Sequence, residues 1–145
     1  MLLPLHVVLK RGVVFLYPRF PALADPVLAG QTKPKYLVVL SASPMDDPVL
    51  YLLTTSRKPR HLTAALAPDF MHIPAGKYMF FPKETIINVA EAGDFSFDRD
   101  SLRELYDSGE IVYQGALDGE DVATLLGMIQ KSMRVAGWVK RLLQP

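Results

Sequence analysis

The pattern of hydrophobic positions divides the chain into a strand-rich part followed by a helical part. Short runs rich in β-branched and aromatic residues, separated by turn-forming residues, predict strands over 12–17, 35–42, 49–56, 60–66 and 78–89. Apolar residues in these runs are often continuous, as in LVVL and YLL. This pattern is typical of strands that are buried on both sides, either in a small closed barrel or in a sheet covered by helices.

The segments between the predicted strands are rich in Pro, Gly and Asp. PMDDP at 44–48 and PAGK at 74–77 predict turns, because these residue types supply the bends of a tight connection. Residues 18–34 form a longer connection that contains four prolines. A connection of that length within a compact domain is usually functional or disordered.

The last third of the chain changes character. Residues 98–110 predict a short helix and residues 111–117 a last strand. Asp118 then stands where a helix N-cap belongs, with Asp121 three residues further on. Apolar residues at spacings of three and four follow, and they predict one face of a long C-terminal helix: Val122, Leu125, Leu126, Ile129, Met133 and Ala136. Residues 134–145 either continue this helix, with Gly137 as a weak point, or form a separate C-terminal tail.

Composition supports one globular domain over residues 1–145 that is mainly β, of the α+β class. The chain is 50% hydrophobic and 21% charged, and a domain of this size buries roughly 70% of its unfolded surface. It has no cysteine, which excludes disulfides and thiolate chemistry and favours a cytoplasmic location. The start, MLLPLHVVLKRG, has too short an apolar stretch for a membrane span or a signal peptide.

Charge is nearly balanced overall but unevenly placed. The formal net charge is +1 at pH 7, which argues against a general nucleic-acid coat protein. Basic residues exceed acidic ones in residues 1–60, and the reverse holds in the rest of the chain. Such an asymmetry allows a basic face for an anionic partner, although folding could also intermix the two halves.

No strong catalytic or metal-binding motif is present. His6, His61 and His72 are widely spaced, so a metal site built from them would need three segments to converge, and we expect neither metal nor cofactor. Asp98 and Asp100 could pair as acid and base, but at the start of a predicted helix they fit capping and dipole roles better.

The order of several short motifs carries a resemblance. A Lys-Arg-Gly-Val start at residues 10–13 precedes the first strand, and a Lys33-Pro34 step opens the second. A later strand ends in Thr-Thr-Ser at residues 54–56, and another contains TIIN at residues 85–88, before the terminal helices. In this order the chain resembles the MazF/PemK toxin family from about Lys10 to Met133.

The resemblance implies a small SH3-like barrel with a short helix and a long C-terminal helix. It further implies a homodimer, an antitoxin polypeptide as partner, and metal-independent cleavage of single-stranded RNA. In such a reaction a base takes the proton of the ribose 2′-hydroxyl, a cation stabilises the phosphorus centre, and an acid protonates the leaving oxygen. A non-catalytic barrel that binds RNA or a protein through the same face is the alternative.

The family's catalytic positions fall on particular residues of this chain. Its arginine of the Arg-Pro step falls on Lys33, and its threonine at the strand end falls on Thr54, with Thr55 as the alternative register. Its later arginine and aspartate fall on Thr85 and Asn88, so both charges are replaced there. This replacement keeps the non-catalytic alternative open.

The basic segment after the third strand supplies further candidates. Arg57, Lys58 and Arg60, together with Lys35, are predicted to bind RNA phosphates. The side chain of histidine ordinarily has a pKa near neutrality, which makes His61 the candidate for proton transfer; the simpler interpretation is a histidine that faces solvent or hydrogen-bonds a turn. Phe20, in the long connection, is predicted to stack on a base.

Overall fold

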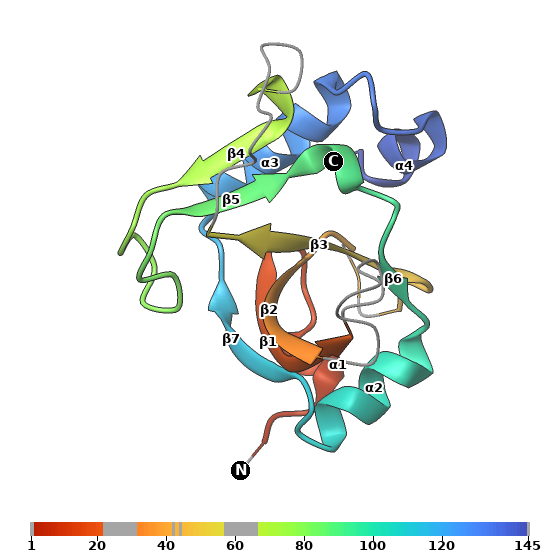
Figure 1. The fold of residues 1–145 in the computed structure, drawn as a ribbon. Helices are drawn as coiled ribbons and strands as arrows, with labels where there is room; N and C mark the ends of the chain where they lie inside the picture. The colour runs from red at the N-terminus through yellow and green to blue at the C-terminus, as the bar shows by residue number, and fades with distance from the viewer. Residues whose placement is uncertain (1, 22–31, 42, 44, 57–66, 145) are drawn as a thin grey trace.

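The computed structural model describes residues 2–21, 32–41, 43, 45–56 and 67–144 (Figure 1). The fold is α+β, with an antiparallel sheet that curls into a half barrel and short helices at its ends. The strands are β1 (Val13–Pro21), β2 (Thr32–Val39), β3 (Val49–Thr55), β4 (Phe70–Ile73), β5 (Thr85–Asn88), β6 (Ser96–Phe97) and β7 (Val112–Ala116). The helices are α1 (Leu5–Val8), α2 (Arg99–Asp107), α3 (Gly119–Lys131) and α4 (Gly137–Leu142), with 3-10 turns η2 (Ala67–Asp69) and η3 (Val89–Glu91).

The sheet has the strand order β4-β5-β3-β2-β1-β7, and β6 adds to β3. All of its pairs are antiparallel. In the β2–β3 pair Leu37 lies opposite Leu53, and in the β3–β5 pair Thr54 lies opposite Ile87. The strand β3 therefore joins the two halves of the curled sheet.

The strands are buried on both faces, as their continuous apolar runs predict. On β2, Val38 belongs to a core cluster shared with Leu125 of α3 and Val139 of α4. Its neighbour Leu37 belongs to a second cluster, shared with α1 and with Leu102 of α2. Because side chains alternate along a strand, one run of hydrophobic residues fills both cores. Figure 1 shows α3 and α4 at one end of the half barrel and α1 and α2 at the other.

Several predicted elements agree with the structure. The short helix predicted at 98–110 is α2, and the strand predicted at 111–117 is β7. The Asp118 carboxylate caps α3, because its Oδ1 accepts a hydrogen bond of 2.7 Å from the backbone N–H of Asp121. The run at 60–66 lies outside the described residues.

The strand predicted at 78–89 is wrong over most of its length. Only Thr85–Asn88 forms a strand, and residues 78–84 form turns and irregular backbone. The aromatic residues in this stretch pack against one another, with Phe80 and Phe81 only 4.7 Å apart between ring centroids. Pro82 also lacks the N–H that a strand ladder needs. The strand β4 was not predicted, because its four residues are too few for a clear pattern.

The boundaries of the long connection also differ from the prediction. The strand β1 extends to Pro21 and β2 begins at Thr32, so Phe20 lies on a strand and not in the connection. Phe20 pairs with Lys33 across these two strands. Its ring packs edge to face against Tyr17, with 5.6 Å between the centroids.

The C-terminal segment bends back after α3. The helix ends at Lys131, and the Ser132 hydroxyl accepts a hydrogen bond of 3.2 Å from the backbone N–H of Arg134, a local bond that competes with helix continuation. Met133 is 97% exposed, so its predicted place on the packed helix face is wrong. Val139 and Leu143 are buried in the core, which fastens α4 to the domain.

The longest of the described helices, α3, has 13 residues. None of them is long and apolar enough to cross a bilayer.

Candidate functional site

A pocket of about 610 Å³ opens where β2 begins and β3 ends, and we name it the strand-end pocket. Three kinds of side chain line it. They are the lysines Lys33, Lys35 and Lys83, the hydroxyl residues Thr54, Thr55, Ser56 and Thr85, and the aromatic residues Tyr36, Phe80 and Phe81, with two prolines between them. Among these described lining residues none is acidic. The pocket therefore combines positive charge, hydrogen-bond donors and flat apolar surface.

The two faces of the β2–β3 pair contribute different side chains to this pocket. Continuing the register of Leu37 and Leu53 places Tyr36 opposite Thr54 and Lys35 opposite Thr55. Because side chains alternate, Lys35 and Thr55 share one face and Tyr36 and Thr54 share the other. Thr54 is only 7% exposed, whereas Thr55 is half-buried. Thr55 is thus more accessible than Thr54, and it shares a sheet face with Lys35.

An aromatic wall closes one side of the pocket. Tyr36 meets Phe81 edge to face at 5.4 Å, and Phe80 stacks on Tyr78 at 5.2 Å between ring centroids. Phe80 also packs closely over Gly115 of β7, where an added Cβ would lie 2.8 Å from a ring carbon. Gly115 has a φ of +153°, so a side chain there would strain the backbone as well as displace Phe80.

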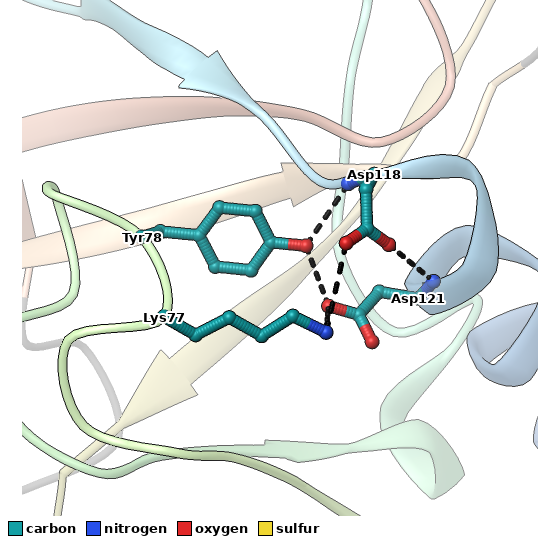
Figure 2. A network of polar contacts seen from close by, with 4 residues as sticks. All are labelled: Lys77, Tyr78, Asp118 and Asp121. Carbon is teal, nitrogen blue, oxygen red and sulfur yellow. Dashed lines mark hydrogen bonds and ion pairs between the residues drawn. The ribbon is translucent and has the colours of Figure 1, made fainter.

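The loop that carries this wall is fastened to the start of α3 by four side chains (Figure 2). The Tyr78 hydroxyl donates to Oδ2 of Asp121 at 2.5 Å and accepts from the backbone N–H of Asp118 at 2.9 Å. The Lys77 ammonium lies 2.9 Å from a carboxylate oxygen of Asp121 and 3.6 Å from one of Asp118. This network, which we name the loop clamp, joins the pocket wall to a rigid helix.

The electrostatics of the loop clamp keep Tyr78 and Asp118 in the protonation states that their hydrogen bonds require. Burial raises the pKa of Tyr78 to about 12, and the hydrogen bond to Asp121 acts in the same direction. The backbone N–H of Asp121 lowers the pKa of Asp118, with a further contribution from Lys77. At neutral pH the phenol therefore stays a donor and the carboxylate stays charged.

Removing the Tyr78 hydroxyl tests the loop clamp. Tyr78→Phe deletes a hydrogen bond to a charged acceptor and leaves a backbone N–H without its partner, so we expect a loss of about 2 kcal/mol in the free energy of unfolding. Urea denaturation measures the change. Tyr113→Phe, which removes an exposed tyrosine hydroxyl on β7, is the matched control and should change stability by less than about 0.5 kcal/mol. Equal stability of the two variants would show that the clamp contributes little.

The structure brings together four of the residues predicted from sequence. Lys33, Lys35, Thr54 and Thr55 all line the strand-end pocket. Phe20 is not among the described lining residues, although it pairs with Lys33. The remaining predicted residues, Arg57, Lys58, Arg60 and His61, lie outside the described part of the chain.

Sequence reasoning missed the aromatic residues that the loop before β5 contributes to the pocket. Lys83 and Phe80 line the pocket, but the aromatic run around them was interpreted as strand. Pro82, which is followed directly by Lys83, was the feature of the sequence that could have indicated a loop here in place of a strand.

The described acidic and histidine side chains do not form a metal site. Within the described ranges no group of three or more His, Asp or Glu side chains could hold a metal ion. His72 and Glu84 form an exposed pair with 3.2 Å between Nδ1 and Oε1.

We compared the chain with known proteins on the basis of its sequence. No family model matches it, and no curated protein matches it significantly. The α+β half barrel and the strand-end pocket are therefore the observations from which a function can be argued.

Proposed function

We propose that the protein binds single-stranded RNA in the strand-end pocket and cleaves it without a metal ion, as a toxin of the MazF/PemK type. The observation that carries the proposal is the convergence of Lys33, Lys35 and Lys83 in a pocket whose described lining holds no acidic residue. Ammonium groups bind phosphates as point charges, and several together follow a nucleic-acid backbone.

The aromatic wall favours a nucleic acid over a simple phosphate. Single-stranded RNA is recognised largely through unstacked bases that lie on aromatic rings. Tyr36 and Phe80 provide such rings beside the lysines. The hydroxyls of Thr55 and Ser56 can bond phosphate or ribose oxygens, including the 2′-hydroxyl that distinguishes RNA from DNA.

Cleavage requires a base, a cation and a proton donor around one phosphate. In the proposed site Lys33 and Lys35 stabilise the charge that develops on the phosphoryl oxygens, and Thr55 donates a hydrogen bond to one of them. The described lining holds neither a carboxylate nor an imidazole. The base must therefore come from beyond this lining, and His61 remains a sequence-based candidate outside the described residues.

Thr85 and Asn88 stand where the MazF/PemK family has an arginine and an aspartate. This replacement favours the second candidate, a non-catalytic barrel that binds RNA or a protein. Thr85 is 5% exposed and donates to the backbone carbonyl of Lys83 at 3.1 Å. The Asn88 side chain caps η3 by accepting from the backbone N–H of Ala90 at 3.0 Å. Both side chains have structural bonds where the resemblance expects an arginine and an aspartate.

The proposal has consequences for architecture and partners. It implies that the curled sheet is the described part of an SH3-like barrel. It also implies that the protein is a cytoplasmic homodimer and that an antitoxin polypeptide binds it. Light scattering of the purified chain tests the dimer. A protein that is monomeric at micromolar concentration would contradict that part of the proposal.

An RNA cleavage assay in the presence of EDTA tests the enzymatic candidate. Wild-type protein should cut single-stranded RNA and leave 2′,3′-cyclic phosphate ends. Lys33→Ala and Thr55→Ala should each reduce the rate by about 100-fold, because each removes a group that stabilises the transition-state charge. Lys131→Ala, an exposed lysine at the end of α3, is the control and should cut at the wild-type rate.

The results separate the two candidates. RNA binding without cleavage, and without growth arrest when the chain is expressed alone, would support the non-catalytic barrel. Equal cleavage by wild type, Lys33→Ala and Thr55→Ala would place the activity outside this site.

A further inference from the structure

Glu91 is a half-buried carboxylate close to the strand-end pocket that the proposed function has not used. It lies on η3, immediately after β5. Its Oε1 accepts a hydrogen bond of 3.5 Å from the Asn88 side-chain amide. Because the Asn88 oxygen is bonded to the backbone N–H of Ala90, the amide is held in place, and Glu91 is held with it.

Strand register places Asn88, the residue that contacts this carboxylate, on the sheet face of Lys35 and Thr55. Thr55 lies opposite Ile86 of β5, and Asn88 is two residues further along the same strand, so Asn88 shares that face. Directly opposite side chains in a sheet have Cβ atoms about 5 Å apart, and diagonal neighbours lie about 7 Å apart. Lys35, Thr55 and Asn88 therefore form a polar row along one face. The Glu91 carboxylate lies next to Asn88, and it is close enough to Lys35 for the lysine charge to act on it.

The surroundings of Glu91 suit a group that gains and loses a proton. Burial is the largest influence and raises its pKa above the ordinary glutamate value, and the charge of Asp94 adds to this increase. The Asn88 hydrogen bond and Lys35 act in the opposite direction. The charged groups that act on Glu91 are thus Asp94, in the turn after η3, and Lys35, on β2. A carboxylate whose pKa is raised toward neutrality is a better general base than an ordinary exposed one.

We propose that Glu91 is the general base that takes the proton from the ribose 2′-hydroxyl when RNA bound at Lys35 and Thr55 is cleaved. The assignment deepens the proposed function and rests on it. Glu91 supplies the proton acceptor that the described pocket lining lacks, and it contacts Asn88, which lies on the face of Lys35 and Thr55. Asn88 acts as a positioning residue, since it touches Glu91 and fixes where the carboxylate lies.

The reaction step balances with the groups present. The 2′ proton passes to the Glu91 carboxylate, and the 2′ oxygen forms a bond to phosphorus. The bond between phosphorus and the 5′ oxygen breaks, and that oxygen receives a proton from water. The hydroxide that remains takes the proton from Glu91, which restores the carboxylate and the water. The products are a 2′,3′-cyclic phosphate and a 5′-hydroxyl, and no metal or oxidant takes part. Lys35 stabilises the charge on the phosphoryl oxygens during the step.

The test compares Glu91→Gln with wild-type protein in two measurements on the same single-stranded RNA. Cleavage should slow by at least about 100-fold, because general-base catalysis contributes roughly that factor or more. RNA affinity should stay the same or increase slightly, since the substitution removes a negative charge near the RNA. Glu104→Gln, the same substitution at an exposed position on α2, changes charge equally and should keep cleavage close to the wild-type rate.

A pH profile distinguishes a base from a residue that only maintains structure. A base must be deprotonated, so the wild-type cleavage rate should rise with pH through the pKa of Glu91 and then level off. Asp94→Asn should move this rise to lower pH, because it removes a negative charge that raises the pKa of Glu91. The residual rate of Glu91→Gln should lack the rise.

The outcomes separate this inference from the proposed function. If wild type binds and cleaves RNA and Glu91→Gln cleaves equally well, the assignment of Glu91 is wrong and the function stands. If wild type binds RNA but never cleaves it, the assignment is wrong and only the binding role stands. If wild type shows no affinity for RNA, both are wrong. Should Glu91→Gln fail to fold, a wild-type rate that does not change between pH 4 and pH 7 would overturn the assignment.

Discussion

Replacing Lys33, Lys35 and Lys83 together with Gln should lower the affinity for single-stranded RNA on the order of 100-fold at 0.1 M salt. These three lysines line one pocket, and none of its described lining residues is acidic. Each phosphate contact releases condensed counterions, and for single strands it contributes about 0.7 to the slope of log affinity against log salt concentration. The triple variant should therefore show a slope that is flatter by about 2.

A salt titration followed by fluorescence anisotropy of a labelled oligonucleotide measures both quantities. The control is Lys10→Gln, Lys131→Gln and Lys140→Gln combined, which makes the same change in net charge at residues that do not line the pocket. If the control weakens binding as much as the pocket variant, the affinity arises from overall charge. The strand-end pocket would then not be the RNA site.

Phe80→Ala should weaken RNA binding by about 1–3 kcal/mol, the amount that base stacking on an aromatic side chain contributes per base. Phe80 is half-buried at the pocket wall and is held by Tyr78 on the loop clamp and by close contact with Gly115. Because the ring is fixed before RNA arrives, binding a base to it costs little ordering entropy. Unlike the lysine variant, Phe80→Ala should leave the slope of log affinity against log salt unchanged.

The neighbouring residue provides a matched control. Met79 is fully exposed at 100%, one position before Phe80 in the same loop. Met79→Ala should change affinity by less than about 0.5 kcal/mol if only the wall stacks on bases. Phe80→Tyr keeps the ring and should bind almost as well as wild type. Loss of affinity in Phe80→Tyr equal to that in Phe80→Ala would mean that the ring does not act as a stacking surface.

The loop before β5 shows why the pocket could be predicted only in part. Its sequence, YMFF, contains the residues that favour strands, and it was predicted as one. It forms a loop, because Phe80 packs on Tyr78, Phe81 packs on Tyr36, and a hydrogen bond from Tyr78 joins the loop to α3. Two of these contacts, Tyr36 with Phe81 and Tyr78 with Asp121, join residues that are more than 40 positions apart. No local pattern contains that information.

The threonine that shares a sheet face with Lys35 could also be identified only from the structure. The sequence leaves Thr54 and Thr55 as alternatives, because adjacent strand residues differ only in the face to which they point. The register with β2 places Thr55 on the face of Lys35 and leaves Thr54 almost fully buried. Glu91 could not be selected from the sequence at all, since its closeness to Lys35 depends on how β5 pairs with β3.

The sequence by itself determined the β1–β3 strand pattern, burial on both faces of the sheet, the α2 helix, β7 and the Asp118 cap. Each of these depends on the periodicity of apolar residues or on short-range capping chemistry, which lie within one segment. The tertiary structure decided where α3 ends, which threonine meets Lys35, and which loop completes the strand-end pocket. The physical reason is that strand register and loop packing are fixed by contacts between distant segments, and their energies do not appear in the local sequence.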